Sequence, residues 1–136
     1  MYPVELTIPM SKDLTDHGFE GLSTPEEVDT ALVKSGTTLL VVNSVCGCAA
    51  ANARPGAKIA ATNDKKPDHM ATVFAGVDRA ATERAREYLL PYPPSSPSIA
   101  LFKDGKLVHF LERHHIEGRS AEIIAENLKM AFDRYC

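Results

Sequence analysis

The sequence has no apolar run long enough to cross a membrane and no basic cluster. A membrane-spanning helix takes roughly 20 consecutive apolar residues, and the uninterrupted apolar runs here are far shorter. The longest basic run is Lys65-Lys66, and 15 basic against 18 acidic residues give a net charge of −3. Residues 1–5 hold no basic segment of the kind that opens a secretory signal. We therefore expect a soluble cytoplasmic protein that binds neither membranes nor nucleic acid.

Cysteine is scarce as well, with three residues in a chain of 136. An odd number of thiols in a reducing compartment does not indicate a disulfide framework, and such cysteines are more often catalytic or metal-binding. No repeat or low-complexity segment divides the chain, and its length suits one core. We expect a single domain over residues 1–136, in which 1–22 form an N-terminal extension or a short helix near 10–17.

Helix caps, chain breakers and apolar periodicity divide the rest of the sequence into alternating elements. The predicted strands are 37–43, 70–75, 98–102 and 106–111. The predicted helices are 24–35, 48–62, 78–90 and 120–135. Asp104-Gly105 is a strong hairpin signal between the last two strands, and Pro55-Gly56 should kink or loosen the second helix. The order predicts an α/β, thioredoxin-like fold whose mixed four-stranded sheet combines a parallel crossover with a C-terminal hairpin and has helices on both faces.

Two of the three cysteines lie where a predicted strand gives way to a helix. Cys46-Gly47-Cys48 follows the apolar strand and opens the Ala-rich stretch 49–53. The first amides of a helix lack intrahelical partners and carry partial positive charge, so a sulfur held there is stabilised as the thiolate that attacks disulfides. The position predicts thiol–disulfide chemistry at Cys46. The alternative is a pair of inert thiols at a packed strand end.

A single residue, Gly47, separates the two cysteines. Residues two apart on a helix project to different sides, so a Cys46–Cys48 disulfide requires the first turn to unwind or the bond to strain. Gly47 lowers that cost because it permits unusual backbone angles. A strained disulfide is readily reduced. We expect a poor thioredoxin-like reductant, better suited to disulfide isomerisation or to carrying a small thiol on Cys46.

The wider pattern resembles the bacilliredoxin family over essentially the full chain. The matching segments are 43–50 with its Cys-Gly-Cys, Ala53-Arg54-Pro55, Ser95-Ser96-Pro97-Ser98, His109-Phe110, Glu117-Gly118 and a C-terminal cysteine. The resemblance implies an enzyme that removes bacillithiol, a low-molecular-weight thiol, from bacillithiolated client proteins. On this reading Cys46 attacks the bacillithiol sulfur and the client thiol leaves. Cys48 then resolves the adduct or remains a spectator.

The same resemblance implies no cofactor beyond bacillithiol as a thiol co-substrate, which regenerates the protein together with an upstream disulfide reductase. Two alternatives stay open. One is a weak protein disulfide isomerase that uses the same cysteine. The other is a non-catalytic module that holds a metal or an iron–sulfur fragment on Cys46 and Cys48.

Pro97 is the second element of the predicted site. It directly precedes the strand 98–102, where thioredoxin-like folds place a cis proline that faces the nucleophile. We therefore expect a cis Ser96–Pro97 bond, although cis X-Pro bonds are uncommon in folded proteins generally. Substrate-binding groups are expected at Gly47, Ser96 and Pro97. The alternative is a rigid loop of trans prolines.

The remaining candidates are weaker. Asn43 is a further substrate-binding candidate, but Asn43 and Ser44 are expected mainly to cap or turn the chain. Arg54 would attract an anionic cap such as the malate carboxylates of bacillithiol, although the expected role is a solvated helix arginine. Cys136, at the end of an amphipathic helix, is a candidate accessory thiol that should be frayed and exposed.

Histidines raise the question of a metal site. His109 and the pair His114-His115, together with the two thiols, would offer ligands for zinc or copper. About 60 residues separate the histidines from the thiols, and the ligand set lacks a Cys-x-x-Cys knuckle. Adjacent histidines on a strand also point to opposite faces. We therefore predict no metal site.

Overall fold

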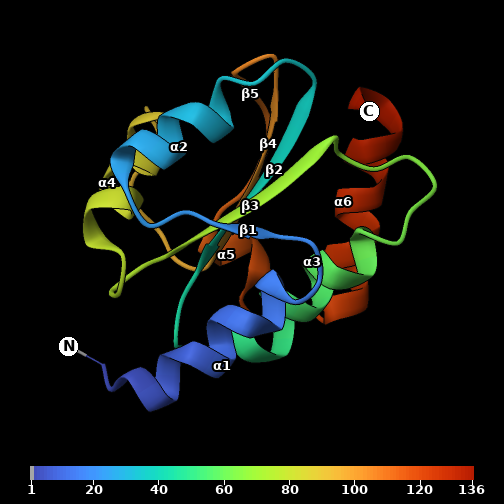
Figure 1. The fold of residues 1–136 in the computed structure, drawn as a ribbon. Coiled ribbons are helices and arrows are strands. Elements are labelled where there is room, and N and C mark those ends of the chain that lie inside the picture. The colour runs from blue at the N-terminus through green and yellow to red at the C-terminus, as the bar shows by residue number, and fades with distance from the viewer. Residues whose placement is uncertain (1) are drawn as a thin grey trace.

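A five-stranded mixed sheet forms the centre of the protein (Figure 1). The computed structural model describes residues 2–136, so Met1, which the predicted domain includes, lies outside the described residues. The strand order is β1-β3-β2-β4-β5, with β3 parallel to β1 and β2, and β4 antiparallel to β2 and β5. The strands are β1 Glu20–Gly21, β2 Thr37–Asn43, β3 His69–Phe74, β4 Ser98–Lys103 and β5 Lys106–Leu111.

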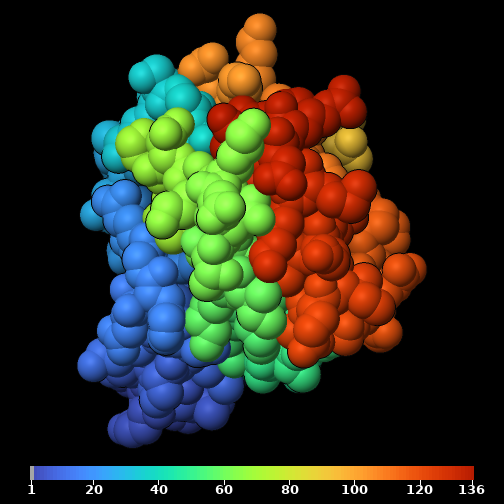
Figure 2. All heavy atoms as spheres, turned by 90° about the vertical axis from the view of Figure 1, so that its right-hand side faces the viewer, coloured from blue at the N-terminus to red at the C-terminus, as the bar shows by residue number. Residues whose placement is uncertain are grey.

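Helices cover both faces of this sheet, as predicted. They are α1 Val4–Thr15, α2 Pro25–Leu32, the π-helical turn η1 Ala49–Ala53, α3 Arg54–Ala60, α4 Arg79–Glu87, α5 Arg113–Ile116 and α6 Ala121–Tyr135. One face carries α2 and α4, and the other carries α1, α3 and α6, which lie side by side in Figure 2. No helix in residues 2–136 is long and apolar enough to cross a membrane.

The central strand β2 supplies both hydrophobic cores, because successive side chains point to opposite faces. All seven of its residues are buried. Leu39 and Val41 pack with the core under α1, α3 and α6, while Leu40 and Val42 pack with the core under α2 and α4. The continuous apolar run therefore reflects burial on both sides. Burial on both faces holds β2 in place, and with it the carboxyl end of the strand, after which the Cys-Gly-Cys segment begins.

The N-terminal segment differs from its prediction. The sequence predicts four strands and a short helix near 10–17, whereas the structure has a fifth strand, β1, and a longer helix, α1, that begins at Val4. β1 is two exposed residues paired with Ala71 and Thr72 of β3, too short to show a strand period. Pro9 lies inside α1, and a proline there argues against a helix when only local signals are read. Tertiary packing of Leu14, which is fully buried, overrides that signal.

The helix after the thiols is loosened where the sequence predicts it. The π-helical turn η1 immediately precedes α3, which has Pro55 in its first turn. Pro55 has no amide hydrogen to give to an earlier carbonyl, so regular α-helical bonding is interrupted here. Gly56 is required here for a steric reason, because a Cβ at this position would lie 2.7 Å from Ile124 Cγ2 of α6. The glycine thus allows α3 and α6 to approach closely.

The C-terminal hairpin forms as predicted, with Asp104 and Gly105 at φ 50° and 81° in its turn. The segment after it was not predicted. His114 and His115 lie on α5, a short helix, and the expectation that they occupy a strand is wrong. The Glu112 backbone caps this helix, since its amide donates to His115 Nδ1 and its carbonyl accepts from the His115 amide. A four-residue helix with a single apolar residue, Ile116, shows no apolar period by which to find it. Helix α5 brings Arg113 to the site described next.

Candidate active site

The two neighbouring thiols lie at the carboxyl end of β2, where the chain turns into the helix that continues as η1 and α3. The Cys46 carbonyl accepts hydrogen bonds from the amides of Ala49 at 3.1 Å and Ala50 at 3.2 Å, so Cys46 begins the helix. Cys46 and Cys48 are free, partly exposed thiols, and Gly47 between them is exposed with open space on its Cβ side. The structure therefore places Cys46 at the helix start that the sequence predicts.

Ser44 contacts the sulfur of Cys46 directly. Its Oγ lies 3.0 Å from Cys46 Sγ and also accepts a weak hydrogen bond from the Cys46 amide at 3.4 Å. Burial raises the pKa of Cys46, but the Ser44 hydroxyl, the amides of Ala49 and Cys48, and the charge of Arg113 together outweigh it, so the pKa is lowered overall. A lowered pKa favours the thiolate, the nucleophilic form. The expectation that Ser44 mainly caps or turns the chain misses this contact.

Asn43 faces inward, away from any substrate. It is 1% exposed, and its Oδ1 accepts from the amide of Ser44 at 2.9 Å and from Arg54 Nη1 at 3.1 Å. Its Nδ2 donates to the carbonyl of Met10 at 3.2 Å. Because both ends of the amide are committed inside the protein, the prediction of substrate binding by Asn43 is wrong. Asn43 instead shapes the loop that carries Ser44.

Arg54 is not a solvated helix arginine, and that expectation is also wrong. The residue is 4% exposed. Its Nη1 donates to the Ser44 carbonyl at 3.2 Å as well as to Asn43, and its Nε pairs with Asp13 Oδ2 of α1 at 3.1 Å. Burial raises the pKa of Asp13, but Lys58 and Arg54 outweigh it and lower that pKa overall. Arg54 thereby ties α1 to the loop beneath the nucleophile.

Arg113 is a further residue of the site, one that is not among those predicted from the sequence. Its Nη2 lies 3.8 Å from Cys48 Sγ, its Nη1 donates to the Ser96 carbonyl at 3.1 Å, and its Nε pairs with Glu117 Oε2 at 3.0 Å. These bonds connect the thiols to the loop that precedes Pro97. The pKa of Arg113 is raised, first by Glu117 and then by the charge of Cys46.

A signal for Arg113 exists in the predicted hairpin. At the end of the hairpin away from its turn, Ile99 of β4 pairs with Leu111 of β5, and an irregularity between Leu101 and Phe102 separates this pair from the turn. Continuing this antiparallel register by two residues brings Arg113 level with Pro97. The irregularity shifts the pairing by one residue, which the local sequence does not reveal. The structure is therefore needed to place Arg113 beside the thiols.

The Ser96–Pro97 peptide bond is cis, as expected, and so is Leu90–Pro91. Pro97 is buried and Ser96 is partly exposed. Through Arg113, the structure brings Ser96 and Pro97 together with the two predicted catalytic cysteines. The Ser96 carbonyl is occupied, since it accepts the hydrogen bond from Arg113.

Comparisons with known proteins agree with this geometry. A family described as Disulphide isomerase matches residues 2–136. A bacilliredoxin from Cytophaga hutchinsonii is 59% identical over 133 residues, which is 98% of this chain and 98% of that protein. A bacilliredoxin from Halalkalibacterium halodurans is 52% identical over 136 residues, covering 99% of this chain and 94% of that protein. The chain belongs to the bacilliredoxin family.

Solved structures show that this bacilliredoxin-family chain has a thioredoxin fold. A putative oxidoreductase with a thioredoxin fold matches with a TM-score of 0.65 at 14% identity, over 82% of this chain and 96% of that one. A mutant thioredoxin from Halobacterium salinarum matches with a TM-score of 0.62 at 17% identity, over 88% of this chain and 91% of that one. The predicted fold class is confirmed, and with the family it makes the chain a thiol–disulfide oxidoreductase.

Cys136 lies far from the other two cysteines of this bacilliredoxin-family chain. Its thiol is near Thr37, Asp68 and Lys103, which mark the end of the sheet opposite to Cys46. The seven residues of β2 span about 23 Å at the usual rise of a strand. Figure 1 likewise shows the C-terminus away from α5. Cys136 is exposed, as expected, but it does not serve as an accessory thiol to Cys46 within one chain.

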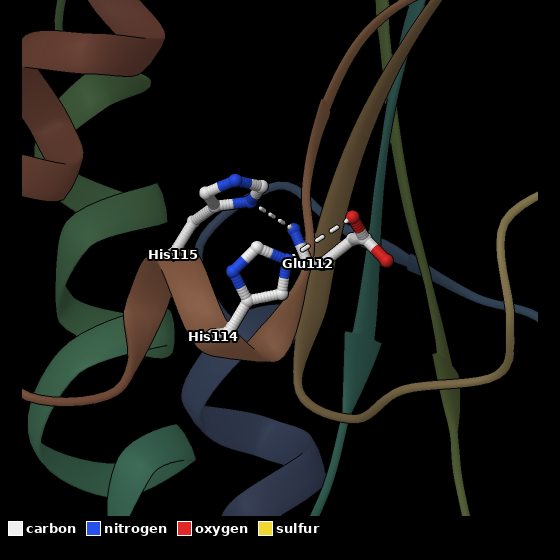
Figure 3. A group of neighbouring side chains, drawn as sticks. All are labelled: Glu112, His114 and His115. Atoms are coloured by element: carbon white, nitrogen blue, oxygen red, sulfur yellow. Dashed lines mark hydrogen bonds and ion pairs between the residues drawn. The ribbon is translucent and has the colours of Figure 1, made fainter.

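Among the described residues, one group of three side chains offers possible metal ligands close together: Glu112, His114 and His115 (Figure 3). His115 Nδ1 accepts the hydrogen bond of the Glu112 amide at 3.0 Å, and His114 Nε2 lies 3.3 Å from Glu112 Oε2. His115 Nδ1 is thus already engaged in capping α5. The thiols of Cys46 and Cys48 are not in this group, so residues 2–136 do not complete a four-ligand zinc or iron–sulfur set around them.

Proposed function

We propose that this chain removes bacillithiol from client proteins, with Cys46 as the nucleophile. The observation that carries the proposal is the 3.0 Å contact between Ser44 Oγ and Cys46 Sγ at the start of a helix. Together with the helix amides it favours the thiolate of Cys46. The names of the closely similar relatives, all bacilliredoxins, support bacillithiol as the small thiol.

The reaction is a thiol–disulfide exchange. The Cys46 thiolate attacks the bacillithiol sulfur of the mixed disulfide, the bond between that sulfur and the client sulfur breaks, and the client leaves as a reduced thiolate. Cys46 then carries bacillithiol in a new mixed disulfide. The number of disulfide bonds is unchanged, so the step needs no cofactor.

Regeneration follows by one of two exchanges. In the first, a second bacillithiol attacks the bacillithiol sulfur on Cys46, which releases bacillithiol disulfide for an upstream disulfide reductase. In the second, Cys48 attacks Cys46 Sγ and expels bacillithiol, which leaves an internal disulfide that the upstream disulfide reductase must then reduce to restore both thiols. The single intervening residue makes the second route slow, so Cys48 is an optional resolving thiol. A reducing compartment such as the cytoplasm suits either route.

Disulfide isomerisation is the second candidate, because the matching family is described as Disulphide isomerase. The same Cys46 thiolate would attack a disulfide within a client protein and leave after a client thiol attacks the resulting mixed disulfide. Both activities depend on Cys46. They differ in whether the sulfur that Cys46 attacks belongs to a small thiol or to a polypeptide.

The deciding experiment uses wild type, Cys46→Ser and Cys48→Ser. Each is incubated with a bacillithiol-capped client and the intact proteins are weighed. We expect the bacillithiol mass on Cys48→Ser and none on Cys46→Ser. Equal transfer to both variants would show that the attacking cysteine is misassigned. No transfer to any variant, with Cys46-dependent refolding of a scrambled disulfide protein, would favour the isomerase.

A further inference from the structure

We propose that Arg113 is a specificity-determining residue that selects mixed disulfides whose small-thiol half carries a carboxylate. This inference rests on the proposed function and names the substrate feature that the same site recognises. It starts from the guanidinium group, which lies between Cys48 Sγ, the Ser96 carbonyl and the Glu117 carboxylate.

The ion pair between Arg113 and Glu117 can be replaced by one between Arg113 and another carboxylate. The two side chains are 43% and 54% exposed, and ion pairs at such exposure contribute little because solvent screens them. A planar guanidinium matches a carboxylate through two parallel hydrogen bonds. A carboxylate brought in by a substrate can therefore take the place of Glu117 at small cost.

The exchange reaction itself changes the charge around Arg113. Before the reaction, the thiolate of Cys46 is an anionic neighbour of the guanidinium. Once Cys46 Sγ forms a disulfide with the small thiol, that sulfur is neutral. A carboxylate on the small thiol restores the lost negative charge at the step in which the thiol transfers, whereas a neutral or cationic small thiol does not.

The geometry around Cys46 also leaves room for a bonded small thiol on the side where Arg113 lies. Ser44 Oγ and the helix amides occupy the inner side of the Cys46 sulfur, while the Cβ side of Gly47 is open and Ser96 is partly exposed. The side of Cys46 open to a bonded thiol is therefore the outer one, where Gly47 and Ser96 are accessible and the Arg113 guanidinium lies beside Cys48.

Arg54, which the sequence offers as an attractor for an anionic cap, does not compete for this role. It is 4% exposed and its guanidinium is bonded to Asp13, Asn43 and Ser44. Arg113 is also the cation whose charge acts on Cys46. Arg113, 59 positions further along the chain, is therefore the arginine placed to meet an anionic cap.

The test compares two caps of similar size and opposite charge on one client peptide: 3-mercaptopropionate, which is anionic, and cysteamine, which is cationic. Transfer rates onto Cys46 are measured by intact mass at low ionic strength, and the anionic-to-cationic ratio of rates is the readout. Any change in the intrinsic nucleophilicity of Cys46 affects both caps, so it cancels in this ratio. A merely structural role for Arg113 would leave the ratio unchanged.

For Arg113→Gln we expect the ratio to fall about three- to tenfold. Arg113→Lys keeps the charge and should stay closer to wild type, and Glu117→Gln should raise the ratio by freeing the guanidinium. Arg134→Gln is the matched control, since Arg134 stacks on Tyr135 in the last turn of α6 and its loss should leave the ratio unchanged.

Two outcomes would overturn the inference: an unchanged ratio in Arg113→Gln, or a fall in Glu117→Gln. If Arg113→Gln does not fold, Arg113→Lys and Glu117→Gln still decide the question. Failure of the proposed function looks different, because then neither cap reaches Cys46 in the wild-type protein. Transfer of both caps with a ratio independent of Arg113 contradicts this inference alone.

Discussion

Ser44 Oγ lies 3.0 Å from Cys46 Sγ, two residues away along the chain. The serine hydroxyl stabilises the sulfur on the side that faces the protein, and the helix amides of Cys48 and Ala49 add to this effect. Ser44 is held in turn by Asn43 and Arg54 through its amide and its carbonyl. The reactivity of the nucleophile therefore depends on Asn43, Ser44 and Arg54, which are buried behind it.

Ser44→Ala should raise the pKa of Cys46, because the mutation removes the hydroxyl that favours the thiolate. Thiolate reactivity increases as pH rises through the pKa, so the rate profile should move to higher pH. At pH 7 we expect alkylation of Cys46 to be about two- to fivefold slower. The measurement is the pH dependence of iodoacetamide labelling in a background that lacks Cys48 and Cys136. Ser35→Ala, at an exposed position, is the control, and coinciding profiles would refute the role of Ser44.

Arg54→Met should destabilise the fold by about 2–4 kcal/mol, because it removes one of the two cations on Asp13 and takes a buried hydrogen bond from both Asn43 Oδ1 and the Ser44 carbonyl. Urea unfolding measures this loss. The matched control is Lys58→Met, which removes the other cation on Asp13. Its side chain is 28% exposed, so we expect a loss of about 1 kcal/mol or less. Equal losses in the two variants would argue against a central role for Arg54.

Gly56→Ala should cost about 1–3 kcal/mol through overpacking. The added Cβ would meet Ile124 Cγ2 at 2.7 Å and the Ala121 carbonyl at 3.2 Å. Unfolding of Gly56→Ala is compared with Gly47→Ala, where no atom lies within 4 Å of the new Cβ. The double variant Gly56→Ala/Ile124→Val should recover part of the stability. A neutral Gly56→Ala would show that α3 and α6 separate easily.

The redox potential tests the spacing of the two thiols. One intervening residue disfavours the Cys46–Cys48 disulfide, so its reduction potential should be less negative than the thioredoxin value of about −270 mV. Equilibration in glutathione or dithiothreitol buffers, followed by mass analysis of trapped thiols, gives the value. Cys136→Ser should have the same potential, because Cys136 lies at the other end of the sheet. A potential as low as that of thioredoxin would contradict the strain argument.

Local sequence determines much of this protein. The apolar run of β2, the Asp104-Gly105 turn and the Ser120 cap of α6 each depend on neighbouring residues alone, and the structure has each of them where the sequence predicts it. The placement of Cys46 at a helix start follows from the same kind of signal. Such features can be predicted because the residues that cause them lie within one or two turns of each other.

Tertiary structure decides the surroundings of the thiols. Arg54 is buried because Asp13 of α1 and Asn43 of β2 meet it there, and Arg113 lies 3.8 Å from Cys48 because the hairpin and α5 carry it to the carboxyl end of β2. The length of β2 separates Cys136 from the other two cysteines, a separation that the sequence does not show. Asp13 and Arg54 are 41 residues apart, and Cys48 and Arg113 are 65 apart, so only the packed sheet and helices bring these pairs together.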